Sequence, residues 1–202
     1  MANITLRPPS FSLAKPPLDY NSPSISWLTE TWHVTHSTLP MWKNKRNVRI
    51  QYIPLPPSTA SVSKESTDRI DDWVSYQSVK DAKVHTIHGV DSLSSSASGD
   101  GGRDAWDWHG KGMLKLAGKL AESHWEILAW GEEEEAKNKW VVTMFAKTLF
   151  TPAGINVYSQ SKEGLRSETV QRVKSALAKV EDESVRSLAG QLFEIQMDSA
   201  RD

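Results

Sequence analysis

The chain has 202 residues, which is enough for one domain with a buried core of its own. Its 24 Lys and Arg residues nearly balance its 25 Asp and Glu residues, giving a formal net charge of −1. This balance argues against a protein that binds nucleic acid through a basic surface. The sequence contains no cysteine, which excludes disulfides, thiolate nucleophiles and cysteine-based zinc sites.

The N-terminal part, residues 1–26, is rich in proline and serine. Because proline interrupts both helices and central strands, we expect an extended arm here, followed by a single domain over residues 27–202. The arm has no apolar run typical of a signal peptide, and no segment of the chain has the length and apolarity of a membrane span. The sequence therefore predicts a cytoplasmic protein that does not bind membranes.

From Trp27 to about Gln160, short segments alternate apolar and polar residues and are separated by turn residues. This pattern predicts about eight β-strands. Residues 91–104 are too polar to pack, so we expect a long loop between the fourth and fifth strands. The predicted strands are Thr31–Thr38, Asn47–Leu55, Trp73–Val79, Lys83–Val90, Ala105–Leu114, His124–Gly131, Trp140–Leu149 and Ile155–Ser159.

After residue 165 the apolar residues recur at helical spacing, which predicts amphipathic helices within residues 167–198. The two apolar stripes consist of Val170, Val173, Leu177 and Val180, and of Val185, Leu188, Leu192 and Ile195. Sequential strands followed by helices favour an antiparallel up-and-down β-barrel over a sandwich. We therefore predict a mainly β fold, an eight-stranded barrel covered by C-terminal amphipathic helices. A barrel of this size can enclose one small ligand.

Three segments carry a resemblance to a known family. TWHVTHSTLPMWK (31–43), SHWEILAWG (123–131) and WVVTMFAKTLFTPAG (140–154) resemble the small lipocalin-like proteins of filamentous fungi, within the calycin superfamily. The resemblance covers roughly residues 27–160. It implies a lipocalin-like barrel that holds a small hydrophobic molecule, in some cases in secondary metabolism. The Gly-x-Trp of secreted lipocalins is absent, because Glu30 stands two residues before Trp32.

The chain contains nine tryptophans, most of them in predicted strands. Strand alternation predicts that several point into the barrel, where apolar walls with a few polar groups would form a small-molecule pocket. The alternative is a solid core filled by the same indoles. The residues predicted to line the pocket are Trp32, His36, Tyr52, Gln77, Trp106, Trp108 and Trp125.

An inward-facing histidine exchanges protons near neutral pH, so the same pocket could support acid–base catalysis. The candidate catalytic residues are His36, His88 and Glu126, the last only if a bulge turns it inward. Two functions follow: binding of a small hydrophobic molecule, or a cofactor-independent cyclase, pericyclase, isomerase or dehydratase acting on a polyketide or terpenoid. A protein-interaction module that uses the terminal helices or the arm is a third interpretation.

The histidines do not form a typical metal motif. His33/His36 and His85/His88 are spaced by three, and on a strand such residues point to opposite faces. We therefore expect no metal and no cofactor. The predicted partner is a small hydrophobic molecule, and the protein is expected to be a monomer or a homodimer.

Overall fold

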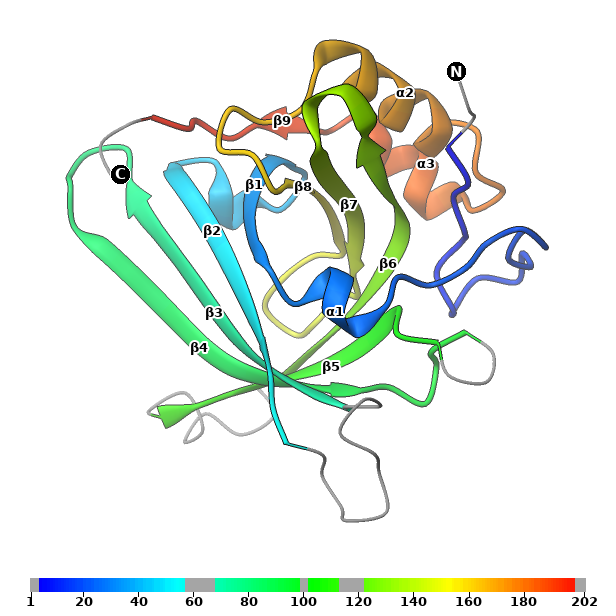
Figure 1. The fold of residues 1–202 in the computed structure, drawn as a ribbon, viewed down its shortest axis with the longest axis horizontal. Coiled ribbons are helices and arrows are strands. Elements are labelled where there is room, and N and C mark those ends of the chain that lie inside the picture. Colours follow the sequence, from blue (N-terminus) through cyan, green and yellow to red (C-terminus); the bar gives the residue numbers. More distant parts are fainter. Residues whose placement is uncertain (1–3, 57–67, 99–101, 113–121, 199–202) are drawn as a thin grey trace.

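The computed structural model describes residues 4–56, 68–98, 102–112 and 122–198 (Figure 1). Within them, eight antiparallel strands follow one another around a closed barrel, which confirms the predicted fold class. β1 closes the barrel by pairing with both β8 and β2. The strands are β1 (Thr31–Ser37), β2 (Lys45–Pro54), β3 (Arg69–Ser78), β4 (Val84–Leu93), β5 (Ala105–Gly110), β6 (Glu122–Glu133), β7 (Asn138–Phe145) and β8 (Gly154–Ser159).

The strand bounds differ from the predicted ones mainly between β3 and β5. β3 begins at Arg69 and β4 continues to Leu93, so the paired region extends into the predicted loop over residues 91–104. β5 ends at Gly110, and the predicted end of this strand at Leu114 lies outside the described residues.

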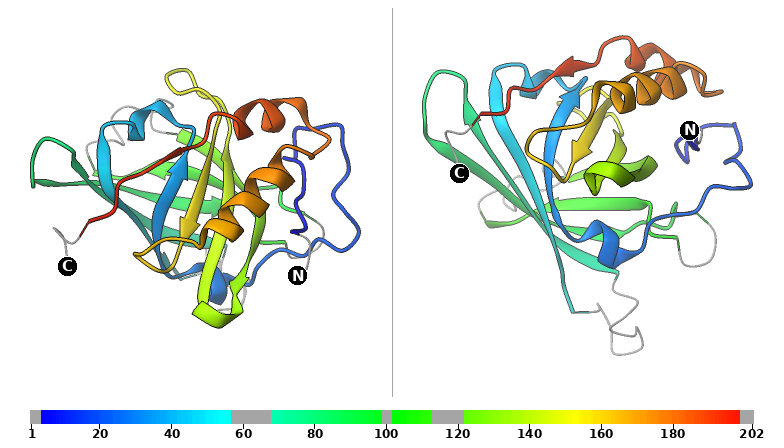
Figure 2. Two further views of the ribbon diagram at one scale, coloured as in Figure 1. Left: turned by 90° about the horizontal axis from the view of Figure 1, so that it is seen from above. Right: turned by 45° about the horizontal axis from the view of Figure 1, so that its top comes forward.

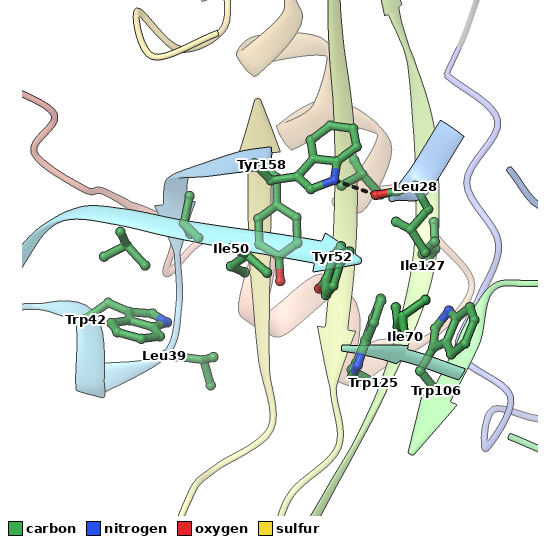
Figure 3. Close-up of a cluster of buried hydrophobic side chains, with 14 of the residues drawn as sticks. Leu28, Leu39, Trp42, Ile50, Tyr52, Ile70, Trp106, Trp125, Ile127 and Tyr158 are labelled. Carbon is green, nitrogen blue, oxygen red and sulfur yellow. Dashed lines mark hydrogen bonds between the residues drawn. The ribbon is translucent and has the colours of Figure 1, made fainter. Parts of the chain in front are cut away.

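Two separate groups of apolar side chains hold the fold together. Inside the barrel lie the residues that alternation directs inward, among them Trp32. Figure 3 shows four others, Ile50, Tyr52, Trp106 and Trp125. Trp32 donates its indole N–H to the carbonyl oxygen of Leu28 at 2.9 Å. Leu28 ends the short helix α1 (Ile25–Leu28), which therefore closes one end of the barrel.

The second group lies between the outside of the barrel and two helices, α2 (Ser167–Leu177) and α3 (Glu183–Ala189). Figure 2 shows both helices on one side of the barrel. Val173 and Leu177 of α2 pack with Val142 and Val157, which point outward from β7 and β8. The amphipathic stripes predicted from the sequence are explained by this contact.

The second helix is shorter than its predicted stripe, because the chain leaves the helix after Ala189 and forms strand β9 (Phe193–Glu194). β1 pairs with β2 only over Thr31–His33 and then pairs with β9 at His36 and Ser37. The C-terminal segment thus fills the gap where β1 and β2 diverge. Ile195 accordingly joins the apolar cluster inside the barrel instead of extending a helix.

The predicted N-terminal arm lies against the outside of β5 and β6. The backbone N–H of Arg7 donates to the carbonyl oxygen of Leu128 at 2.9 Å. Leu128 lies within a β-bulge of β6, between Ile127 and Ala129 in the register with β7, so the arm pairs with the strand where its ladder is interrupted. Among the described residues, no helix is long and apolar enough to cross a membrane.

Candidate functional site

A cavity of about 220 Å³ lies beside the loop between β7 and β8. Figure 2 shows this loop at the end of the barrel opposite α1. Its walls are mainly apolar and aromatic. One carboxyl group, that of Asp72, faces it from β3, and Glu122 lies at the start of β6. The aromatic and aliphatic lining includes Trp42, Ile50, Tyr52, Val74, Ile87, Trp108, Trp125 and Phe145.

Three of the residues predicted to line a pocket do so. Tyr52, Trp108 and Trp125 contact the cavity from β2, β5 and β6. Tyr52 and Trp125 stack with ring centroids 5.5 Å apart and an angle of 10° between their planes. These two rings therefore form one continuous wall.

Two further predicted residues, Trp32 and Trp106, point inward but are not part of the cavity lining. Both are fully buried in the interior cluster, and Trp106 donates its indole N–H to the carbonyl oxygen of Arg103 at 3.0 Å. Their contacts are with other core side chains, as in the solid-core alternative. The interior thus consists of a packed part near α1 and a cavity at the opposite end.

Two aspartates are buried in the barrel, Asp72 within the cavity lining and Asp91 outside it. Asp72 is 6 % exposed and Asp91 is not exposed. The indole N–H of Trp125 donates to Asp91 Oδ1 at 2.7 Å. Asp72 Oδ1 and Asp91 Oδ2 are buried and have no hydrogen-bond partner among the described residues.

The surroundings of these carboxyl groups favour their protonated forms. Burial raises the pKa of Asp91 to about 7, although the hydrogen bond from Trp125 acts in the opposite direction. Burial, together with repulsion from Asp91, also raises the pKa of Asp72 well above its ordinary value. A carboxyl group with a raised pKa, that of Asp72, therefore faces the cavity, and a second one, that of Asp91, lies beside it in the interior.

His36 was predicted to point inward, and this orientation is wrong. A β-bulge in β1 shifts the register with β8 between Val34 and His36, so that His36 pairs with the outward-facing Val157. Its Nδ1 lies 3.1 Å from the hydroxyl oxygen of Thr35. Burial and the charge of Lys174 in α2 lower its pKa. His36 thus lies under α2, away from the cavity.

His88 and Gln77 also lie on the outer face of the barrel. His88 stacks on Trp73, with ring centroids 3.6 Å apart, and its Nε2 lies 2.9 Å from Asp71 Oδ1. Gln77 accepts a hydrogen bond from Asn47 at 2.7 Å, at the register shift of β2. Neither belongs to the cavity lining, because alternation along β3 and β4 directs their neighbours inward instead.

Glu126 keeps the outward orientation expected in the absence of a bulge, because the bulge of β6 comes after Ile127. Arg7 forms an ion pair with it at 2.7 Å, and His124 Nε2 lies 3.0 Å from its Oε1. Although burial opposes its ionisation, hydrogen bonds from His124 and Ser10 and the charge of Arg7 lower the pKa of Glu126 to about 2. Glu126 is therefore an anchor for the arm and does not face the cavity.

Asp72 and Asp91 are not among the predicted site residues, because the predicted strands begin at Trp73 and end at Val90. One signal could have identified them. Gly89 stands within a strand, which often marks a close approach of another group. A Cβ at Gly89 would lie 2.2 Å from Nε1 of Trp108, and Gly89 pairs directly with Asp72. Extending the alternation from Gly89 by two residues in β4 gives Asp91.

Within the described parts of the chain, no group of three or more acidic or histidine side chains is placed to hold a metal ion. No protein-family model matches the sequence, and no curated protein matches it.

Solved lipocalins have a similar fold. Lobster apocrustacyanin A1 is 11 % identical, with a TM-score of 0.53, over 87 % of this chain and 81 % of that one. Apocrustacyanin C1 is 10 % identical, with a TM-score of 0.51, over 85 % and 78 %. The siderocalin Ex-FABP is 13 % identical, with a TM-score of 0.51, over 86 % and 96 %. At these identities the likeness shows the fold alone, and it supports a lipocalin fold for this chain.

Proposed function

We propose that this protein binds a small, largely apolar molecule in the cavity at the end of the barrel opposite α1. The observation that carries the proposal is the cavity itself, in which Tyr52, Trp108 and Trp125 form an aromatic wall. Ligand pockets typically combine such walls with a few polar groups and range from roughly 300 to 1,000 Å³. With about 220 Å³, this cavity fits a compact ligand better than a long acyl chain.

Titration of the purified protein with compact apolar compounds tests the proposal. Because Trp108 and Trp125 line the cavity, a bound ligand is expected to change the tryptophan fluorescence in a saturable way. Trp108→Ala should weaken binding about tenfold or more, which corresponds to about 1.4 kcal/mol, without unfolding the protein. The control is Trp73→Ala, which removes an outward-facing indole that is 38 % exposed. Equal affinities in the two variants would contradict the proposed location of the site.

The second candidate is a cofactor-independent enzyme on the same scaffold, a cyclase, pericyclase, isomerase or dehydratase acting on a polyketide or terpenoid. His36, His88 and Glu126 face away from the cavity, so they do not support this role directly. The carboxyl group of Asp72 does support it, because it lines the cavity and its pKa is raised by burial and by Asp91, which suits a general acid. Mass spectrometry of the same mixtures separates the two functions, since only an enzyme changes its ligand.

We also propose four properties that were expected from the sequence. They are a fungal type of lipocalin-like protein, a role in secondary metabolism, a cytoplasmic location and a monomeric or homodimeric state. The cysteine-free composition is consistent with a reducing compartment.

A further inference from the structure

The interior of the barrel contains two carboxyl groups with no basic partner. Asp72 and Asp91 come from neighbouring strands, where Asp72 pairs with Gly89 and Ile70 pairs with Asp91. They are therefore diagonal neighbours on the inner face of β3 and β4. Neither forms an ion pair with a residue that the structure describes, and each has one buried oxygen without a hydrogen-bond donor.

Such a pair is unfavourable for the stability of the folded chain. A buried carboxyl group without sufficient donors loses its hydration, and two of them close together also repel each other when ionised. The outward-facing neighbour Asp71 shows the usual arrangement instead, since Lys111 Nζ lies 2.7 Å from its Oδ1. The chain thus gives a cationic partner to the partly exposed Asp71 and none, among the described residues, to the buried Asp72 beside it.

The cavity next to Asp72 has the character of a cation site. Among the described residues of its lining, the charged side chains, Asp72 and Glu122, are both acidic, and none is Lys, Arg or His. Tyr52, Trp108 and Trp125 line the same space, and aromatic rings stabilise cations that lie over their faces. An ammonium group carries three donors, which suits carboxyl oxygens that lack them.

We propose that the ligand is a compact aromatic or aliphatic amine, whose protonated nitrogen binds Asp72 while its apolar part lies against Tyr52, Trp108 and Trp125. This inference rests on the proposed binding function and specifies the ligand class for the same cavity. An anionic ligand is disfavoured, because it would bring a further negative charge beside Asp72 and Asp91. A neutral ligand could accept or donate a hydrogen bond at Asp72 but would gain no ion pair with it.

Proton release is the signature of this mode of binding. Without ligand, burial raises the pKa of both carboxyl groups and so favours their protonated forms, whereas a bound ammonium group favours the ionised carboxylate of Asp72. The other titratable groups around the pair are Tyr52 and Tyr158, both buried, and Asp71, Asp107 and Glu122. Burial raises the pKa of both phenols, so they stay protonated and do not release the proton at pH 7.

Calorimetric titration of the full chain with three matched probes tests the proposal: 2-phenylethylamine, 2-phenylethanol and 3-phenylpropionate. Each titration is done at pH 7 in two buffers with different ionisation enthalpies. We expect the amine to bind at least tenfold more tightly than the alcohol, the acid to bind most weakly, and the amine alone to release protons.

Asp72→Asn should weaken binding of the amine about tenfold or more and leave the alcohol unaffected. Asp71→Asn is the matched control, because it removes the outward-facing neighbour, and it should change neither affinity. Asp91→Asn provides a second inward variant, and thermal unfolding verifies that each variant is folded. Amine binding that is unaffected in both inward variants would overturn the proposal.

Two outcomes separate this inference from the proposed function. If the alcohol binds as tightly as the amine, or the acid binds best, the amine proposal is wrong while the cavity remains a binding site. If none of the three probes binds and no compact apolar compound changes the tryptophan fluorescence, both the amine proposal and the binding function are wrong.

Discussion

At the scale of single residues, the cavity depends on the contact between Gly89 and Trp108. The indole lies so close to the backbone of β4 that a Cβ at Gly89 would be 2.2 Å from Nε1 and 2.3 Å from Cε2 of the ring. A glycine in the middle of a strand often allows such a close approach, because it has no side chain. It lets Trp108 lie flat next to Asp72 and leaves space in front of the ring for a ligand.

Gly89→Ala is therefore expected to displace the Trp108 ring into the cavity. We expect a loss of about 1–3 kcal/mol in the free energy of unfolding, as for other overpacked interiors, and weaker binding of any cavity ligand. Urea unfolding and the fluorescence titration measure the two effects. Gly190→Ala is the control, since nothing lies within 4 Å of its added Cβ and its φ of −72° suits alanine. If Gly89→Ala has wild-type stability and ligand affinity, the Trp108 indole adopts another conformation that leaves the cavity open.

Alternation predicted the orientation of single residues correctly only up to the next bulge. Trp32, Tyr52 and Trp125 point inward as their strands predicted. His36 does not, because the bulge before it inverts the pattern for the rest of β1. A bulge adds one residue without a distinctive composition, so its position was not evident from the sequence.

At the scale of elements, the N-terminal arm is part of the fold and not an appendage. Arg7 is 2 % exposed and forms ion pairs with Asp104 at 3.0 Å and with Glu126 at 2.7 Å. Its Nε also donates to the carbonyl oxygen of Ile127 at 2.8 Å, beside the bulge of β6. One guanidinium group therefore joins the arm, the segment before β5 and the middle of β6. The proline content predicted an extended arm, but the partners that anchor Arg7 to the barrel lie more than ninety residues away in the sequence.

Arg7→Ala should destabilise the protein by about 3–5 kcal/mol, because it leaves two buried carboxylates without their counter-ion. Chemical denaturation at pH 7 measures this loss. Arg166→Ala is the control, since its ion pair with Glu135 joins two exposed side chains and should contribute nothing measurable. A small effect of Arg7→Ala would mean that the arm detaches without consequence for the barrel.

The order and number of the elements followed from periodicity, since every predicted strand has a counterpart in the barrel. The structure of the end of the chain did not follow from periodicity. Leu192 and Ile195 continue an apolar helical stripe, but this segment forms backbone hydrogen bonds with the open side of β1 instead of extending the helix. The N–H of Ile195 donates to the carbonyl oxygen of Thr35 at 2.8 Å. This competition depends on where β1 and β2 diverge, which is a property of the assembled barrel and not of the local sequence.

At the scale of the whole molecule, the carboxyl groups inside and outside the barrel have opposite effects on how the stability depends on pH. Asp72 and Asp91 bind their protons more tightly in the folded chain than in the unfolded chain, whereas Glu126 binds its proton more weakly. A raised pKa stabilises the fold at low pH, and this contribution is lost as the pH rises through the folded value. A lowered pKa stabilises the fold at high pH, and this contribution is lost as the pH falls through the folded value. The ligand-free protein is thus expected to be most stable in mildly acidic solution.

The pH range of these effects follows from the pKa values of Asp91 and Glu126. Asp91 shifts from 3.8 to about 7, so stability should fall by a few kcal/mol as the pH rises from about 4 to above 7. Glu126 shifts from 4.5 to about 2, so stability should also fall as the pH decreases below about 4.5. Urea unfolding between pH 3 and pH 8 should therefore show a maximum near pH 4–5. Asp91→Asn should reduce the loss of stability at pH values above this maximum. Glu126→Gln should reduce the loss at pH values below it. A wild-type protein that gains stability steadily from pH 5 to pH 8 would mean that the inner carboxyl pair is ionised throughout. In that case the pair would already have a counter-charge within the folded chain.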